Sequence, residues 1–348
     1  MTKPLAKNQT NSGAKNLLAN PYLHFVLIGA VLILAQVLAR NGILITNSTV
    51  TLLGGVIIYA MACLGLDLLL GYGGMISLGT AGFMGLASYV SAYITVNLHL
   101  PFELGILAAI AVSVCLGLLV GLASLRIEGI YLAMATMIVA EILKKVFEEA
   151  EWFTGSYTGT KAAYPTLLGF HLDRTSTFIM IVVVLVLMMT LAHLVVTSRP
   201  GRALHAMRGS EVAAQAMGIN ILLYRLFAFS LATGFAAVAG VMYVHYFRFS
   251  FPSTWVLALS LSVLSAVIIG GPRSVYGSLI GAFIVFAFPD LVLKKLPVIG
   301  QINGIALVFN GLLIVLVVLF YPSGLVRVFS DIKLLLVRHR NRGGAQCN

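Results

Sequence analysis

The feature that most constrains this chain is a succession of apolar runs, each about as long as a lipid bilayer is thick. A helix needs about 20 apolar residues to cross about 30 Å of hydrocarbon. The runs recur along most of the 348 residues, of which 60% are hydrophobic and only 9% are charged. Soluble domains carry about 25% charged residues, and a soluble fold of this composition would expose apolar patches that it could not bury. The sequence therefore predicts an integral membrane protein.

The runs predict helices, because none of them alternates between apolar and polar residues as a barrel strand does. The fold class that we expect is all-α, a polytopic transmembrane bundle of about ten helices. Pairs of small residues four apart are expected to let these helices pack closely. The pairs are Gly117 with Gly121, Ala236 with Gly240, and Gly277 with Gly281. The expected spans are 22–39, 50–70, 76–97, 102–124, 129–147, 175–197, 222–247, 255–270, 276–293 and 304–321.

The distribution of lysine and arginine predicts the orientation of the bundle. With the N-terminus inside, fourteen of these residues fall on the inner side and eight on the outer side. Both termini are then cytoplasmic, which an even number of helices allows. We expect a cytoplasmic N-terminal tail at 1–21, a membrane domain at 22–321 and a basic cytoplasmic tail at 322–348. Within the membrane domain, 148–174 is the expected outer loop and 198–221 the expected inner loop.

Several kinds of chemistry are not supported by the sequence. The chain has no G-x-x-x-x-G-K-[ST] phosphate loop, no H-E-x-x-H and no G-x-S-x-G. Three scattered cysteines suggest neither a disulfide framework nor a metal site. The net charge of +11 is spread over loops and tails, which indicates membrane topology rather than nucleic-acid binding. We expect a transporter and not an enzyme, with no cofactor bound by this chain.

The stretch "GYGGMISLGTAGFMG" at 71–85 contains six glycines together with Ser77 and Thr80. Each glycine inside a helix costs about 1 kcal/mol relative to alanine. Broken backbone at membrane depth is tolerated where it lines a cavity or is buried in protein. The segment could therefore border a path for a polar solute. A tightly packed, unbroken helix explains the glycines equally well.

Glu141 is an acidic residue well inside an expected span, about 18 Å from a start near residue 129. A lone carboxylate there is costly. Lys144 and Lys145 follow at the spacing of a same-face pair, so a structural ion pair near the outer interface is one interpretation. The other is a polar group facing the solute path. Asp67, close to the inner end of its helix, is interpreted as structural.

The stretch "GRALHAMRGSEVAAQAMGIN" at 201–220 predicts a short amphipathic helix on the inner side. The apolar face of its "EVAAQAMG" part is made of alanines, with no tryptophan, phenylalanine or leucine to sink into a bilayer, and alanines suit insertion into a groove of another protein. A pump without a phosphate loop must use the ATPase of a partner. We therefore expect a helix at 209–217 seated in an ATPase cleft, with Ala213 and Ala214 facing in and Glu211 free to pair with the partner. Arg202, Arg208 and Met217 belong to the same stretch.

Four landmarks in order make the chain resemble the permease subunits of branched-chain amino acid ABC importers of the LivM type. They are "GYGGMISLGTAGFMGLASY", "IYLAMATMIVAEIL" followed by "TGSYTG", "GRALHAMRGSEVAAQAMGIN" through "LFAFSLATGFAAVAGVMY", and "IIGGPRSVYGSLIGAF" with the closing "LVVLFYPSGLV". The resemblance covers about residues 50 to 328. Met75 and Thr80 stand where many relatives carry glutamine and histidine, and Ser156 replaces a glycine.

The resemblance implies a heteromeric importer in a bacterial cytoplasmic membrane. Its parts would be two homologous permeases, two ABC ATPases that bind ATP and Mg²⁺, and an external solute-binding protein. It also implies the roles of individual residues. Ser77, Leu78, Gly79 and Glu141 would belong to the solute path, and Arg202, Glu211, Ala213, Ala214 and Gly218 to ATPase coupling.

The solute itself stays open at this stage. Branched-chain or other hydrophobic amino acids fit the resemblance, but permeases for urea or short-chain amides look similar at this level. A self-contained channel or ion-coupled carrier would need several paired ionisable groups at mid-membrane, and only Glu141 comes close. A scaffold without transport would not explain the glycine-rich segment.

Overall fold

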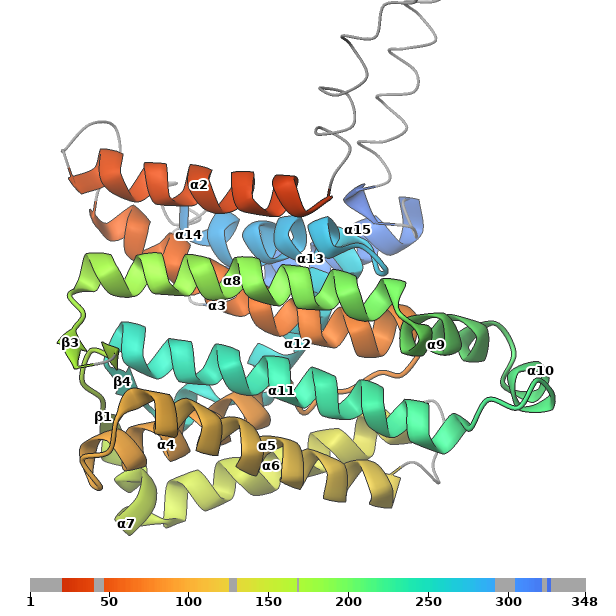
Figure 1. The fold of residues 1–348 in the computed structure, drawn as a ribbon, viewed down its shortest axis with the longest axis horizontal. Helices are drawn as coiled ribbons and strands as arrows, with labels where there is room; N and C mark the ends of the chain where they lie inside the picture. The colour runs from red at the N-terminus through yellow and green to blue at the C-terminus, as the bar shows by residue number, and fades with distance from the viewer. Residues whose placement is uncertain are drawn as a thin grey trace, which may run out of the picture.

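The computed structural model describes residues 21–40, 47–124, 130–167, 169–291, 304–320 and 324–326, and the following statements concern this part of the chain. It is mostly helical (Figure 1). The helices of its first half are α2 (Pro21–Arg40), α3 (Asn47–Asp67), η1 (Leu68–Tyr72), α4 (Thr80–Val96), α5 (Phe102–Ser124), α6 (Ile130–Glu149), α7 (Glu151–Thr154) and η2 (Ser156–Thr158). Those of its second half are α8 (Arg174–Thr197), α9 (Arg199–Gly209), α10 (Glu211–Ala216), α11 (Ile221–Phe247), η3 (Pro252–Thr254), α12 (Leu257–Gly270), α13 (Val275–Ala282), η4 (Phe283–Ala287), α14 (Phe288–Leu291) and α15 (Ile305–Phe320).

Each of the ten expected spans coincides with a helix or a run of helices, so their helical character is confirmed. Six of the helical segments are long and apolar enough to cross a membrane. Shorter apolar helices occupy Thr80–Val96, Val275–Leu291 and Val308–Val317. α6 has 20 residues but carries five charged side chains in its second half. The exact number of crossings therefore stays a prediction. The two expected tails lie almost wholly outside the described residues.

Two helices form the centre of the bundle. α11 contacts α3, α4 and α5 along its length, and α3 also contacts α8, α12 and α13. In the apolar window of α3, 83% of the residues are buried inside the protein, against 17% in α2. A helix that is apolar all round is expected at such a central position. α2 lies at the periphery of the bundle, where it packs mainly on α8 (Figure 1).

The small-residue pairs mark close helix contacts, as expected. A Cβ placed on Gly117 of α5 would lie 2.7 Å from Cγ2 of Thr233 on α11. Gly240 of α11 lies against the backbone of Met84 on α4, and Gly281 of α13 lies against the carbonyl of Ala266 on α12. Glycine at these positions lets the helix backbones approach in a way that any side chain would prevent.

The two long polar segments lie at opposite ends of the molecule (Figure 1). The end opposite α9 and α10 contains α7, η2 and two short antiparallel strand pairs, a detail that the all-α expectation missed. β1 (Thr160–Lys161) pairs with β4 (Phe249–Ser250), and β2 (Thr166–Leu167) pairs with β3 (Phe170–His171). The first pair ties the expected outer loop to the chain that follows α11.

Candidate functional site

The glycine-rich segment is a break between helices and not a continuous helix. α3 continues as the π-helical turn η1 to Tyr72, residues 74–79 are not helical, and α4 begins at Thr80. Gly74 has a φ of 69°, which glycine adopts without the steric cost that other residues incur. The expected span at 76–97 therefore starts later than its sequence indicates, and the alternative of an unbroken helix is wrong.

The broken backbone is buried in protein, and side chains of other helices satisfy its polar groups. The amide of Leu78 donates to Oγ1 of Thr136 on α6 at 2.9 Å, and the amide of Ala81 donates to Oγ of Ser260 on α12 at 3.0 Å. The amide of Gly79 donates to Oγ of Ser77 at 3.3 Å. Buried amides need such partners when the helical ladder is interrupted. Thr136 was not singled out from the sequence, although it stands inside the "IYLAMATMIVAEIL" landmark.

In this conformation the glycine-rich segment encloses almost no free space. Ser77 and Thr80 are 5% and 7% exposed and line a void of about 10 Å³, which has room for at most one water molecule. A Cβ on Gly79 would lie 3.1 Å from Cε2 of Phe83. Leu78 is half-buried. A solute that passes along Ser77 and Thr80 therefore requires the surrounding helices to separate.

Glu141 lies away from this void. Thr136 is fully buried towards the glycine-rich segment, whereas the side chain of Glu141, five residues further along α6, is 45% exposed. Five residues correspond to a rotation of about 140° around a helix, which places the two side chains on different faces. The expected ion pair is confirmed for Lys144, whose Nζ lies 3.9 Å from Oε2 of Glu141. Lys145 pairs with Glu148 instead, at 2.6 Å.

The coupling segment, residues 199–220, contains two helices where the sequence predicted one. α9 ends at Gly209, Ser210 is extended, and α10 covers only Glu211–Ala216. The Oγ of Ser210 accepts a hydrogen bond from the amide of Ala213 at 3.3 Å, which caps the start of α10. The predicted helix at 209–217 is therefore shorter, because this serine ends one helix and begins the next.

The two alanines of α10 face different surroundings, which corrects the expectation that both face a partner. Ala214 is 4% exposed and buried within this chain, whereas Ala213 is exposed. Neighbouring residues in a helix are separated by about 100°, so two in sequence cannot share one narrow face. The apolar side chains that do point outward are Val212 and Met217, which are 81% and 84% exposed.

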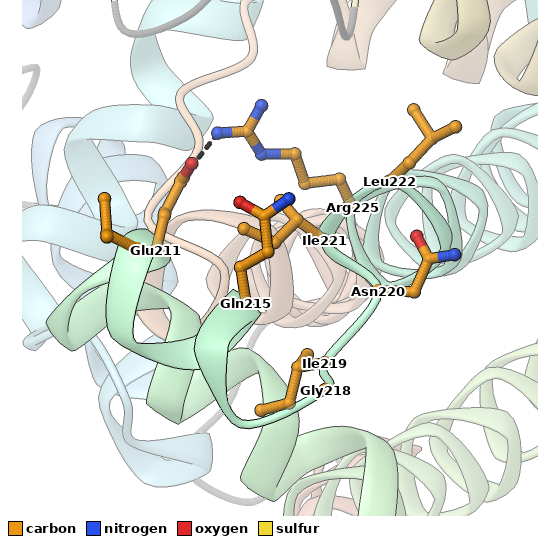
Figure 2. Close-up of a pocket in the computed structure, with 9 residues that line it drawn as sticks. Glu211, Gln215, Gly218, Ile219, Asn220, Ile221, Leu222 and Arg225 are labelled. Atoms are coloured by element: carbon orange, nitrogen blue, oxygen red, sulfur yellow. Dashed lines mark hydrogen bonds and ion pairs between the residues drawn. The ribbon is translucent and has the colours of Figure 1, made fainter.

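Glu211 is paired within this chain and is not free for a partner. Its carboxylate accepts a hydrogen bond from Nη2 of Arg225 on α11 (Figure 2). The side chain of Arg225 is 11% exposed and that of Glu211 is 41% exposed. The pair closes the corner between α10 and α11 above a groove of about 890 Å³. Gly218, with a φ of 82°, lies in the turn that joins the two helices.

The arginines of α9 also bind backbone of this chain. Nη1 of Arg202 donates to the carbonyl of Thr197 at 3.1 Å, next to the end of α8. Nη1 of Arg208 donates to the carbonyl of Gly71, in the turn that leads into the glycine-rich segment. The structure therefore brings Arg208 next to the candidate solute path. Val212, Ala213 and Met217 are exposed apolar residues of the coupling segment.

Comparison with known proteins gives a consistent result. Residues 48–318 match the family described as branched-chain amino acid transport system / permease component. The chain is 26% identical over 308 residues to the high-affinity branched-chain amino acid transport system permease protein LivM of Escherichia coli, a match that covers 81% of this chain and 71% of that protein. It is 25% identical over 201 residues to the autoinducer 2 import system permease protein LsrC of Salmonella typhi, covering 54% and 56%. No solved structure matches the chain significantly.

Proposed function

Because this chain belongs to the family of branched-chain amino acid transport system permease components, we propose that it is the membrane-spanning subunit of an importer that takes up branched-chain amino acids. It is a multi-pass transporter subunit and not an enzyme. The observation that carries the solute class is the family match over residues 48–318, supported by the similarity to LivM along most of both chains. Family membership also argues against a self-contained channel or ion-coupled carrier.

The importer that we propose lies in a bacterial cytoplasmic membrane and needs several other proteins. A second, homologous permease completes the membrane part, and two ABC ATPases bind ATP and Mg²⁺ and supply the driving force. An external solute-binding protein delivers the amino acid. In this orientation both termini and the coupling segment face the cytoplasm, and the loop at 148–174 faces outward. Residues 1–21 and 322–348 flank the membrane domain at 22–321 as cytoplasmic tails.

The coupling segment is the proposed contact with the ATPase. α10 projects from the end of the bundle (Figure 1), and its exposed Val212 and Met217 are apolar side chains in a polar setting. Ala213 is exposed as well, and exposed apolar side chains on a projecting helix suit a cleft of a partner protein. Arg202, Arg208, Glu211, Ala214 and Gly218 support this helix from within the chain. A helix lying on the lipid surface is the competing account of the same apolar residues.

The proposed solute path follows the break in the bundle. Ser77, Leu78, Gly79 and Thr80 border it, and the void beside them opens when the ATPase moves the coupling segment. Glu141 lies on the exposed face of α6, away from this void. We assign it to the path at the contact that this face makes with the second permease. The broken backbone supports this assignment, because non-helical backbone at membrane depth is tolerated where it lines a cavity or is buried in protein, and Thr136 and Ser260 accept the hydrogen bonds of its amides here.

The test is uptake by the whole complex. The chain is produced with its second permease, ATPases and binding protein in cells that lack their own branched-chain amino acid uptake. We expect ATP-dependent uptake of radiolabelled leucine, isoleucine and valine, and much weaker uptake of urea and acetamide. Uptake of urea or acetamide without leucine would overturn the solute class. Uptake that persists without ATPases would overturn the ABC mechanism.

A further inference from the structure

The last turn of α9 touches the residues that lead from α3 into the glycine-rich segment. Nη1 of Arg208 donates a hydrogen bond to the carbonyl of Gly71. A Cβ built on Gly74 would lie 3.3 Å from Cγ of Arg208, so the aliphatic part of this side chain lies against the Gly74 backbone. A single residue of the coupling segment therefore contacts both ends of the 71–74 turn.

The same turn is held on its other side by the connection between α12 and α13. Oδ1 of Asp67 accepts a hydrogen bond from the amide of Arg273 at 2.8 Å, and the hydroxyl of Tyr72 donates to the carbonyl of Arg273 at 2.9 Å. The carboxylate of Asp67 is almost fully buried, with the residue 3% exposed. Arg208 interacts electrostatically with both Asp67 and Arg273. Two distant parts of the chain thus meet at η1.

Gly71 lies close against the backbone of the connection between α12 and α13. A Cβ on Gly71 would lie 2.8 Å from the amide nitrogen of Arg273, and a Cβ on Gly73 would lie 2.6 Å from the carbonyl oxygen of Leu69. Beyond this tight turn the chain is non-helical from residue 74 to 79. π-Helical turns are frequent at functional sites, and closely packed interfaces switch between discrete arrangements rather than deforming gradually.

We propose that Arg208 is the positioning residue that joins the coupling segment to the glycine-rich segment, so that α9 and the 71–74 turn move as one unit during transport. Movement of α9 then shifts the backbone next to Ser77 and opens the closed void. This inference rests on the proposed function, because it needs an ATPase that moves α9. In a merely structural role Arg208 would cap the C-terminal end of α9 and its loss would only lower stability.

The first experiment separates coupling from docking and from stability. The full complex with Arg208→Gln is purified and reconstituted, and amino acid uptake is measured together with ATP hydrolysis. Arg208→Gln should keep the ATPase bound and keep hydrolysis, while uptake per ATP falls about tenfold because a charge-assisted hydrogen bond is lost. Arg208→Lys, which keeps a charged donor, should recover part of the lost uptake per ATP. Arg174→Gln removes an exposed arginine that donates a hydrogen bond to Oγ1 of Thr51, far from the coupling segment, and should leave uptake per ATP unchanged.

The outcomes that contradict the inference are distinct. A wild-type ratio of uptake to hydrolysis in Arg208→Gln, with or without a loss of stability, would overturn it. Release of the ATPase from that variant would assign Arg208 to docking and overturn it as well. Absence of ATP-driven uptake by the wild-type complex would instead overturn the proposed function on which the inference rests.

A second experiment replaces the arginine by a covalent link. A Cβ on Gly74 would lie 3.8 Å from Cβ of Arg208, which is the usual separation in a disulfide. In a chain without Cys63, Cys115 and Cys347, the pair Gly74→Cys with Arg208→Cys should be uncoupled when reduced and regain uptake per ATP when oxidised. Gly74→Cys alone is the control for strain at this positive φ. An oxidised pair that stays uncoupled, or a pair that does not cross-link, would contradict the inference.

Discussion

Arg225 is a charged side chain near the beginning of α11, a long apolar helix, and its ion pair with Glu211 links α10 to α11. Its side chain is 11% exposed, so Glu211 provides it with a carboxylate at the corner between α10 and α11. The sequence contained a signal for this pair, because a lone arginine four residues into a long apolar run needs a partner. Which carboxylate serves it depends on the bend at Ser210, which the sequence did not reveal.

The Glu211–Arg225 pair should contribute measurably to the stability of this corner. We expect the double-mutant cycle of Glu211→Ala and Arg225→Ala to give a coupling free energy of unfolding of about 0.5–1 kcal/mol, since Glu211 is too exposed for a larger value. Thermal unfolding of the solubilised permease supplies the four free energies. Strictly additive single and double changes would mean that the two side chains do not interact in solution.

At the scale of elements, adjacent alanines of α10 should respond differently to the same substitution. Ala213→Arg places a long side chain on the exposed face and should release the ATPase while the permease stays as stable as wild type. Ala214→Arg overpacks a buried position, at a cost of about 1–3 kcal/mol, and should destabilise the permease itself. Unfolding of the isolated permease and recovery of the ATPase in purified complexes distinguish the two effects.

A contrary result for this alanine pair would be informative. If Ala213→Arg retains the ATPase and uptake, the exposed face of α10 is not the docking surface. A lipid-surface helix would then become the better account of Val212 and Met217. That account has its own signature, because Ala213→Arg would then leave complexes intact while changing binding of the segment to anionic vesicles.

The helices were predictable to different degrees for physical reasons. Runs of apolar residues located the ten helical segments, of which six are long and apolar enough to cross a bilayer. The start of α4 was placed at 76 and lies at Thr80, because the break depends on hydrogen bonds from Thr136 and Ser260, residues far away in the sequence. The sequence predicted one helix in the coupling segment instead of two, because a single residue, Ser210, ends α9 and begins α10.

At the scale of the whole molecule, the sequence and the structure give different information about the solute path. The sequence indicated a solute path along the glycine-rich segment at 71–85, and the structure places Ser77 and Thr80 around a void that is closed in this conformation. No single chain can define the open path, since its walls include the second permease that we propose. The roles of Ser77, Leu78, Gly79, Thr80 and Glu141 therefore remain predictions that assembly will test.

The asymmetry of lysine and arginine predicts the orientation of the whole bundle, and this prediction can be tested in intact cells. The two polar ends of the molecule lie opposite each other, so one reporter at each end suffices. Tyr157 is 68% exposed and Gln215 is also exposed, so a thiol at either position can be reached by a reagent in the surrounding solution. In a cysteine-free chain, a membrane-impermeant thiol reagent should label Tyr157→Cys in intact cells and Gln215→Cys only after the membrane is opened. The reverse pattern would place the coupling segment outside, where it could not meet a cytoplasmic ATPase, and would contradict the proposed mechanism of energy supply.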